Sequence, residues 1–174
     1  MSIYQFKELT PSLGQNVYFT EDSVIIGNCE LGDNVNVWFK TVLRGDVNKI
    51  SIGKNTNVQD LSMLHVTEKS PLVIGENVSI GHSVTLHGCI VGNSCLIGMG
   101  ATVLDDANIG NECIVAAGSL VPPGKVYPDQ SMIMGNPAKV VRKLKDEELN
   151  FIRFHYKSYL QYSKEFRIGL KKLD

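Results

Sequence analysis

Three of the four histidines in the sequence lie near one another in the middle of the chain, at His65, His82 and His87. Neutral imidazoles bind divalent metal ions, and three of them with an open fourth position are typical of a catalytic zinc site rather than a structural one. The same ligands also suit Fe2+ and Co2+. A lone histidine such as His82 is more often a hydrogen-bonded interior or surface residue. The metal hypothesis therefore depends on a fold that brings the three together.

An aliphatic residue recurs at every sixth position through the middle of the chain. This period fits neither a helix nor an ordinary strand, but it fits a short strand plus a turn. Three such units bring the chain back above its start and form one coil of a triangular parallel β-solenoid. The clearest run consists of Val91, Ile97, Val103, Ile109, Val115 and Val121. Coils open at Leu31, Ile52, Ile74, Val91 and Ile109.

The repeat and its flanks predict one all-β solenoid domain with an added helix. The β-helix is expected over residues 1–123, with residues 1–30 as an N-terminal capping segment and first partial coil. A connecting loop is expected over 124–145, and a C-terminal helix of the same domain over 146–170. Asp146 is the expected helix cap, and an apolar stripe predicts that the helix packs along the solenoid.

Departures from the six-residue step gather at one corner of the predicted coils. Three extra residues fall near 46–49 and four near 68–71, while the step from Leu86 to Val91 is one residue short. All three changes follow the third repeat of a coil. Insertions on one side of a repeat protein often build its binding face, so we expect the site at this corner.

Alignment of the coils places Arg44, His65 and His87 at the same phase. Adjacent strands lie about 4.8 Å apart, so the two imidazoles can tilt toward one metal ion. His82 has another phase, above Asp60, and therefore lies on another face. A homotrimer with parallel solenoids solves this, because one subunit offers His65 and His87 while its neighbour offers His82.

The segments "LRGDV", "NVQD", "LHV" and "IGHSVTLHG" together resemble the γ-class carbonic anhydrases and their relatives in the hexapeptide-repeat superfamily. The similarity covers about residues 10–143. It implies a left-handed parallel β-helix, a homotrimer with Zn2+ at its interfaces, and reversible hydration of carbon dioxide to bicarbonate. The left hand comes from the resemblance, since the general rule for parallel crossovers favours the right hand.

The resemblance also implies roles for individual residues. The metal ligands are His65, His82 and His87. Gln59 hydrogen-bonds metal-bound water or bicarbonate. The interface or structural residues are Arg44, Asp46, Asn57 and Asp60, of which Arg44 and Asp46 form the pair that joins subunits next to the metal.

Two further residues complete the candidate site. Glu68, three residues after His65, is the candidate proton acceptor, and a surface loop glutamate is the alternative interpretation. Tyr159 is a possible site-lining residue from the helix. The archetypal γ enzyme has an acidic residue directly after the position of Asp46, where this sequence has Val47, and a long acidic loop after the first ligand. These differences put fast turnover in doubt.

Two other functions remain open at this point. A γ-carbonic anhydrase homologue that binds metal with little activity fits the missing acidic residues. An acyl-CoA-dependent acyltransferase of the hexapeptide-repeat type fits "MGNPAKVVRKL", a segment common after the coils of such enzymes. Such a transferase needs a single histidine as general base, however, and not three with metal-ligand spacing.

Composition narrows the partners and the compartment. The chain has 17 Lys and Arg against 18 Asp and Glu and no basic block, which argues against nucleic acid. The absence of a long apolar run argues against a membrane and favours the cytoplasm. The four cysteines form no C-x-x-C pair and are predicted to be small buried apolar residues.

Overall fold

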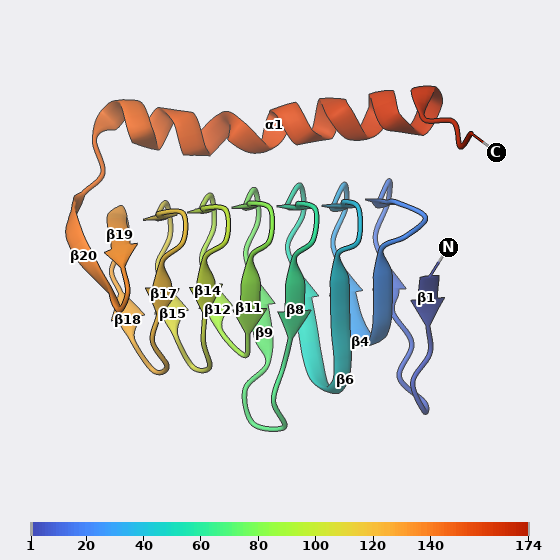
Figure 1. Ribbon diagram of the computed structural model, residues 1–174, viewed down its shortest axis with the longest axis horizontal. Helices are drawn as coiled ribbons and strands as arrows, with labels where there is room; N and C mark the ends of the chain where they lie inside the picture. Colours follow the sequence, from blue (N-terminus) through green and yellow to red (C-terminus); the bar gives the residue numbers. More distant parts are fainter. Residues whose placement is uncertain (1, 174) are drawn as a thin grey trace.

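The chain winds as a parallel β-solenoid along which one long helix runs, in a computed structural model that describes residues 2–173 (Figure 1). The predicted solenoid with a C-terminal helix is confirmed. Short strands stack in register from coil to coil, and nearly all pairs are parallel. Each coil therefore places residues of equal phase directly above one another.

Three faces can be distinguished. The helix-covered face contains β3 (Tyr18–Phe19), β5 (Asn36–Val37), β7 (Asn57–Val58), β10 (Ser79–Ile80), β13 (Leu96–Ile97), β16 (Ile114–Val115), β19 (Ser131–Gly135) and β20 (Ala138–Lys143). The second face contains β8 (Met63–His65), β11 (Thr85–His87), β14 (Thr102–Val103) and β17 (Leu120–Val121). The third contains β2 (Ser12–Leu13), β9 (Leu72–Ile74), β12 (Ile90–Val91), β15 (Asn108–Ile109) and β18 (Val126–Tyr127).

Two long strands join the second and third faces. β4 (Val24–Leu31) and β6 (Val42–Ile52) bend around the corner between them, and β1 (Ser2–Tyr4) pairs with the first half of β4. The first half of β6 pairs with β8 and its second half with β9. This corner is the one at which the sequence predicts insertions. The segment between β8 and β9 extends from it beyond the coils (Figure 1).

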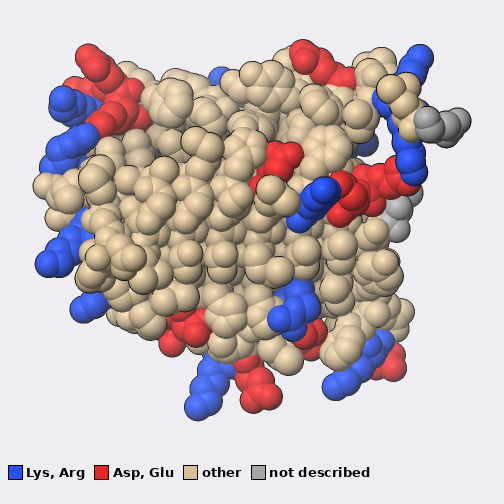
Figure 2. Space-filling view, viewed as in Figure 1, with Lys and Arg blue, Asp and Glu red and all other residues tan. Residues whose placement is uncertain are grey.

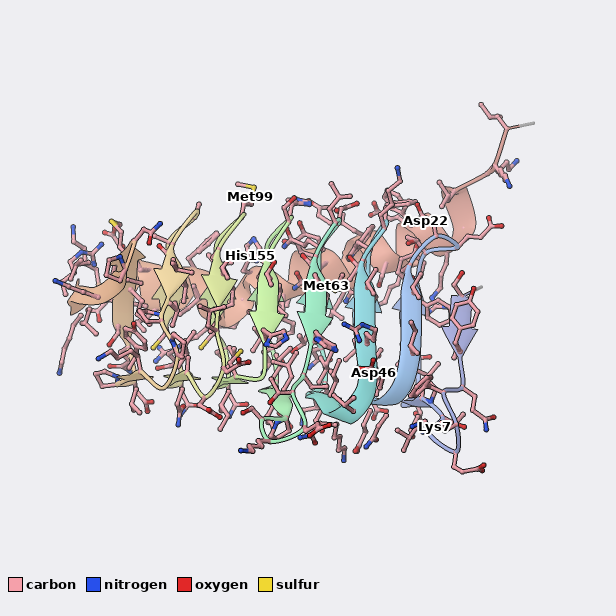
Figure 3. All side chains as sticks on the ribbon, turned by 60° about the horizontal axis from the view of Figure 1, so that its bottom comes forward. Lys7, Asp22, Asp46, Met63, Met99 and His155 are labelled. Carbon is pink, nitrogen blue, oxygen red and sulfur yellow. The ribbon has the colours of Figure 1, made fainter. Side chains whose placement is uncertain are left out.

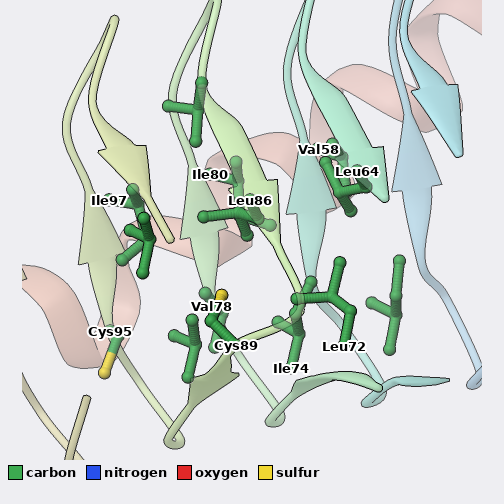
Figure 4. Packing of buried hydrophobic residues seen from close by; sticks show 14 of the residues in the cluster. Val58, Leu64, Leu72, Ile74, Val78, Ile80, Leu86, Cys89, Cys95 and Ile97 are labelled. Atoms are coloured by element: carbon green, nitrogen blue, oxygen red, sulfur yellow. The ribbon is translucent and has the colours of Figure 1, made fainter. Parts of the chain in front are cut away.

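The interior consists mainly of stacked aliphatic side chains from the strands and from the turns between them (Figure 4). Residues at the predicted six-residue step, such as Leu64, Ile80 and Leu86, have no exposed surface. Burial of each such side chain stabilises the fold by about 1.5–3 kcal/mol. All four cysteines are also buried and free of disulfides, as predicted.

A column of asparagines makes one set of turns. Asn16, Asn34, Asn55 and Asn77 all have φ between 57° and 61°, a left-handed conformation that asparagine tolerates better than most residues. The Asn34 side chain donates to Asn55 Oδ1 at 3.0 Å, and Asn55 donates to Asn77 Oδ1 at 2.9 Å. The turn residues therefore also bond coil to coil.

The prediction of a connecting loop over 124–145 is wrong, because this segment contains β18, β19 and β20. The six-residue step continues from Val121 to Tyr127 and Ile133, which are both buried. Tyr127 fills an aliphatic position, and its hydroxyl donates to Ala138 O at 3.0 Å. Because Tyr127 is aromatic and not aliphatic, the sequence pattern did not show that the repeat continues beyond Val121. Antiparallel pairing of β19 with β20 then ends the solenoid.

The helix α1 (Asp146–Gly169) has nearly the predicted bounds, although Lys145, and not Asp146, is the N-cap. The Lys145 backbone N–H donates to the Glu148 carboxylate at 2.8 Å.

The helix packs along the solenoid from its last coils to its first. Leu149 and Ile152 pack on Met132 at the last coils. Further apolar and polar contacts reach the first coils: the Phe166 ring lies 5.1 Å from the Trp38 ring, and Arg167 Nη2 donates to Asn16 O at 3.0 Å and Val17 O at 2.8 Å. The predicted packing along the solenoid is confirmed. In the described range 2–173, no helix is long and apolar enough to span a bilayer.

Candidate metal centre

His65 and His87 end adjacent strands and are register partners, with Arg44 in the same column below His65. The sequence prediction of this stack is confirmed. His65 Nδ1 lies 3.0 Å from His87 Nε2, and the ring centroids are 5.0 Å apart. Two facing imidazole nitrogens at this separation can share a proton or a cation. The two side chains are mostly buried, with exposed fractions of 17% and 31%.

Carboxylates hold the other nitrogen of each ring. His65 Nε2 lies 3.0 Å from Asp46 Oδ1, and His87 Nδ1 lies 2.5 Å from Asp105 Oδ1. Histidine ligands of metals almost always bond a carboxylate or carbonyl through the second nitrogen, which fixes the ring and raises its basicity. The sequence analysis missed Asp105. It lies in the coil above His87 but one step further along, so a search of single columns does not find it.

His82 lies apart from this pair, in the turn between β10 and β11. Its Nδ1 is 2.8 Å from Asp60 Oδ2, and 44% of its side chain is exposed. This agrees with the prediction that His82 stands above Asp60 on another face. Within residues 2–173, no group of three or more His, Cys, Asp or Glu side chains can hold a metal ion in a single chain.

Arg44 and Asp46 form an ion pair within the chain, between Arg44 Nη1 and Asp46 Oδ2. Asp46 also contacts His65, so this carboxylate joins the arginine to the imidazole. Burial opposes its charged form, but hydrogen bonds from His65 and Arg44 outweigh this effect and hold the pKa of Asp46 below its ordinary value. Within the described part of the chain, Asp60 contacts His82 and takes no part in the network of Arg44 and Asp46.

Gln59 and Asn57 are buried beneath α1, with exposed fractions of 4% and 0%. Gln59 Nε2 donates to Asn57 Oδ1 at 3.0 Å. Gln59 and His82 line the same groove, of about 310 Å³, together with Tyr159 and His155 of α1. Burial, aided by Asp60, raises the pKa of Tyr159 to about 12, so its phenol stays protonated at neutral pH. The structure thus brings Gln59 and Tyr159 to the His82 side of the predicted site.

Glu68 lies exposed in the segment between β8 and β9. Its backbone oxygen accepts from Asn48 Nδ2 at 3.1 Å, as does that of Thr67. These bonds tie the segment to the bend of β6, beside which Asp46 is seen in Figure 3. Glu68 is thus on the His65 side of the site, on the surface.

Known proteins are similar to this chain in sequence and in fold. A family model described as bacterial transferase hexapeptide (six repeats) matches residues 71–104 and 88–123. A carbonic anhydrase from Geobacillus kaustophilus is 42% identical over 165 residues, which cover 93% of this chain and 91% of the relative. The chain belongs to the γ-carbonic anhydrase family of hexapeptide-repeat proteins.

Two other members of this wider family extend the comparison. Protein YrdA from Escherichia coli is 44% identical over 168 residues, covering 92% of this chain and 91% of its own. The solved structure of a hexapeptide transferase family protein from Anaplasma phagocytophilum has a TM-score of 0.91 and 35% identity, over 95% of this chain and 98% of that one. The names of these similar proteins therefore refer both to carbonic anhydrase and to the hexapeptide transferase family.

The donor set fits a zinc ion of the kind that γ-carbonic anhydrases imply. Two nitrogens bound to one tetrahedral zinc lie about 3.4 Å apart, close to the separation of 3.0 Å between His65 Nδ1 and His87 Nε2. His82 Nε2 stays free for a third bond, because Nδ1 contacts Asp60. Each of the three imidazoles thus has one nitrogen on a carboxylate, while the other nitrogens of His65 and His87 face each other. His155, whose Nδ1 contacts Ser79 Oγ at 2.9 Å, has no such carboxylate among its hydrogen bonds in the described chain.

Proposed function

We propose that this protein catalyses the reversible hydration of carbon dioxide to bicarbonate, with a divalent metal ion held between neighbouring chains of a homotrimer. The observation that carries the proposal is the pairing of three histidines with three aspartates: His65 with Asp46, His82 with Asp60, and His87 with Asp105. A histidine that only stabilises the fold does not require a carboxylate partner, so three such pairs favour metal binding. Zn2+ is the proposed ion, and Fe2+ or Co2+ fits the same ligands.

A flat, mostly uncharged face supports the proposed trimer. Met63, Thr85, Thr102 and Leu120 form one outward row across β8, β11, β14 and β17. Figure 2 shows that this side of the molecule carries most of its charged residues at the rim. Met63 is 40% exposed in the single chain. A second copy laid on this face would cover apolar surface and bring its own residues next to His65 and His87.

The residues of this chain have separable roles in the proposed reaction. The ion, when bound, supplies a water molecule whose pKa is lowered to about 7. Asp46, Asp60 and Asp105 hold the imidazoles in the orientation that binding requires. The Gln59 amide hydrogen-bonds the water or bicarbonate. Glu68, exposed at the surface beyond His65, accepts the released proton and passes it to buffer.

The direct test is carbon dioxide hydration by protein purified anaerobically, with the metal quantified in the same sample. We expect about one ion per chain and hydration that disappears after chelation and returns with Zn2+, Co2+ or Fe2+. Bound metal without hydration would instead favour a metal-binding homologue with little activity. Absence of metal, together with acetyl transfer from acetyl-CoA, would favour the acyltransferase.

The trimer gives a second prediction. Light scattering on metal-loaded protein should give three times the chain mass of 19.2 kDa. Arg44→Ala and Asp46→Ala should each loosen the trimer and lower the metal content, because Asp46 links Arg44 to His65. Lys54→Ala, which removes a surface ion pair with Glu76, is the matched control and should change neither. A monomeric wild-type protein, or unchanged mass and metal in both site variants, would contradict the shared site.

A further inference from the structure

Polar side chains interrupt the contact between α1 and the sheet beneath it. At the last coils this contact is apolar, formed by residues such as Met132 and Ile152. In the middle it contains Asn57 and Ser79, which are register partners on β7 and β10 and have exposed fractions of 0% and 2%. A buried amide or hydroxyl is costly unless it is hydrogen-bonded. The positions of these bonds therefore matter.

These side chains form a chain of contacts in which the two amide groups donate in the same direction. Gln59 Nε2 donates to Asn57 Oδ1 at 3.0 Å, and Asn57 Nδ2 donates to Ser79 Oγ at 2.8 Å. Ser79 Oγ lies 2.9 Å from Nδ1 of His155, which is on the helix (Figure 3). Since the hydroxyl already accepts from Asn57, its own proton is available for His155 Nδ1. Burial lowers the pKa of His155 and so favours the neutral ring that can accept it.

This sense determines which end of the Gln59 amide meets the groove. The NH2 group is held by Asn57, while Oε1 accepts no hydrogen bond from the described chain. Every buried side-chain nitrogen and oxygen within residues 2–173 has a partner, so Oε1 must be accessible. Gln59 lines the groove together with His82. The groove therefore contains a fixed hydrogen-bond acceptor near the exposed imidazole.

We propose that His155 is a positioning residue which, through Ser79 and Asn57, holds Gln59 Oε1 toward the groove and thereby selects a small anion that carries an O–H group. Bicarbonate has such a donor; nitrate is planar and of similar size but has none. This inference rests on the proposed function for the placement of the anion beside His82. Asn57 Nδ2 also donates to Val78 O, but at 3.4 Å this bond is weaker than the 2.8 Å bond to Ser79 Oγ. Without an acceptor at position 155, the Ser79 hydroxyl can donate to Asn57 instead, and Asn57 and Gln59 can turn over. The Gln59 NH2 group then offers a donor to either anion.

The sense of the chain can be tested in the unaltered protein. Nitrogen-15 NMR of the histidine rings at neutral pH should show His155 with Nδ1 unprotonated and Nε2 protonated. Phe151 and Tyr159 flank this ring on α1, Ser79 faces it from β10, and His82 lines the same groove, so no carboxylate competes for Nδ1 in these contacts. A proton on Nδ1 would make His155 a donor to Ser79 Oγ, so that His155 would no longer determine the direction of the chain, and this would overturn the proposal. This measurement needs neither bound metal nor activity.

The consequence is tested with two substitutions of nearly equal shape. Asn at position 155 can place Oδ1 where Nδ1 lies, whereas Leu has the same branching and no acceptor. In Co2+-substituted protein, the visible spectrum reports binding of bicarbonate and of nitrate. We expect His155→Asn to keep the preference for bicarbonate and His155→Leu to lower it about five- to tenfold, the size of one hydrogen bond.

Thermal unfolding of both variants distinguishes this role from one in which His155 only stabilises the packing of α1 on the sheet. If His155 only fixes α1 to the sheet, both variants should change stability while the preference stays equal to that of the wild type, and this result would overturn the proposal. A protein that binds no Co2+ would instead contradict the proposed function. In that case the ring-nitrogen measurement still decides whether His155 accepts from Ser79.

Discussion

Mixed trimers built from two inactive variants should recover metal that neither variant binds alone. His82→Ala lacks the ligand of one face, and the double variant His65→Ala/His87→Ala lacks the pair on the other. Each homotrimer should lose its metal, because every shared site then misses at least one imidazole. After both are unfolded and refolded together in equal amounts, some interfaces combine an intact His65 and His87 edge with an intact His82 edge. Metal analysis of the refolded trimers measures the recovery.

The expected recovery is about a quarter of the sites, since each side of an interface is drawn from equal pools and the site needs three ligands. Each variant refolded alone is the matched control and should stay empty. Wild-type protein taken through the same procedure should regain full occupancy. If mixed trimers, verified by mass, bind no metal, the site does not lie between chains, and the separation of His82 from His65 and His87 has another cause.

Gly27→Ala should destabilise the fold and disturb the site at the same time. Gly27 has φ of +73°, which costs an L-residue about 1–2 kcal/mol. An added Cβ would also overlap the carbonyl oxygen of Gly45, which is flanked by Arg44 and Asp46 on β6. Overpacking adds about 1–3 kcal/mol, so we expect a total loss of about 2–5 kcal/mol in denaturant unfolding. Metal content should fall, because displacement of Gly45 also moves the adjacent Asp46, whose carboxylate holds His65.

Gly118→Ala is the matched control for the backbone term. Gly118 has φ of +67°, but nothing lies within 4 Å of the position where its Cβ would be. Gly118→Ala should lower the free energy of unfolding by only about 1–2 kcal/mol, the cost of a left-handed conformation for alanine, which also applies at Gly27. The variant should keep its metal. Equal effects in both variants would show that the approach of β4 to β6 is not tight at Gly27.

The sequence was sufficient to predict the coils and the stack of His65 on His87, because in a solenoid equal phase means direct contact between coils. It was sufficient for His82 above Asp60 for the same reason. It failed at Tyr127, where an aromatic side chain fills an aliphatic position and a hydroxyl bond to Ala138 satisfies its polar atom. The six-residue step marks positions that point into the interior, and at Tyr127 an aromatic side chain fills such a position in place of an aliphatic one.

Contacts that cross columns or involve the helix were beyond the pattern. Asp105 reaches His87 diagonally between coils, so neither its column nor its neighbours in sequence indicate the pair. The chain from Gln59 to His155 depends on the path of α1, since Ser79 and His155 are 76 residues apart. An apolar stripe predicts that a helix packs on the solenoid but gives neither its direction nor its register along the coils.

The direction of α1 bears on how the molecule comes apart. A stack of coils in which each contacts only its neighbours can fray from either end, one repeat at a time. Here the helix starts at the last coils, where Leu149 and Ile152 pack on Met132, and finishes at the first, where Arg167 bonds the carbonyl oxygens of Asn16 and Val17. Loss of an end coil therefore releases part of a brace that also holds the opposite end. A linear array becomes one cooperative unit, and partial opening that would separate His65 from His87 is suppressed along with fraying of the ends.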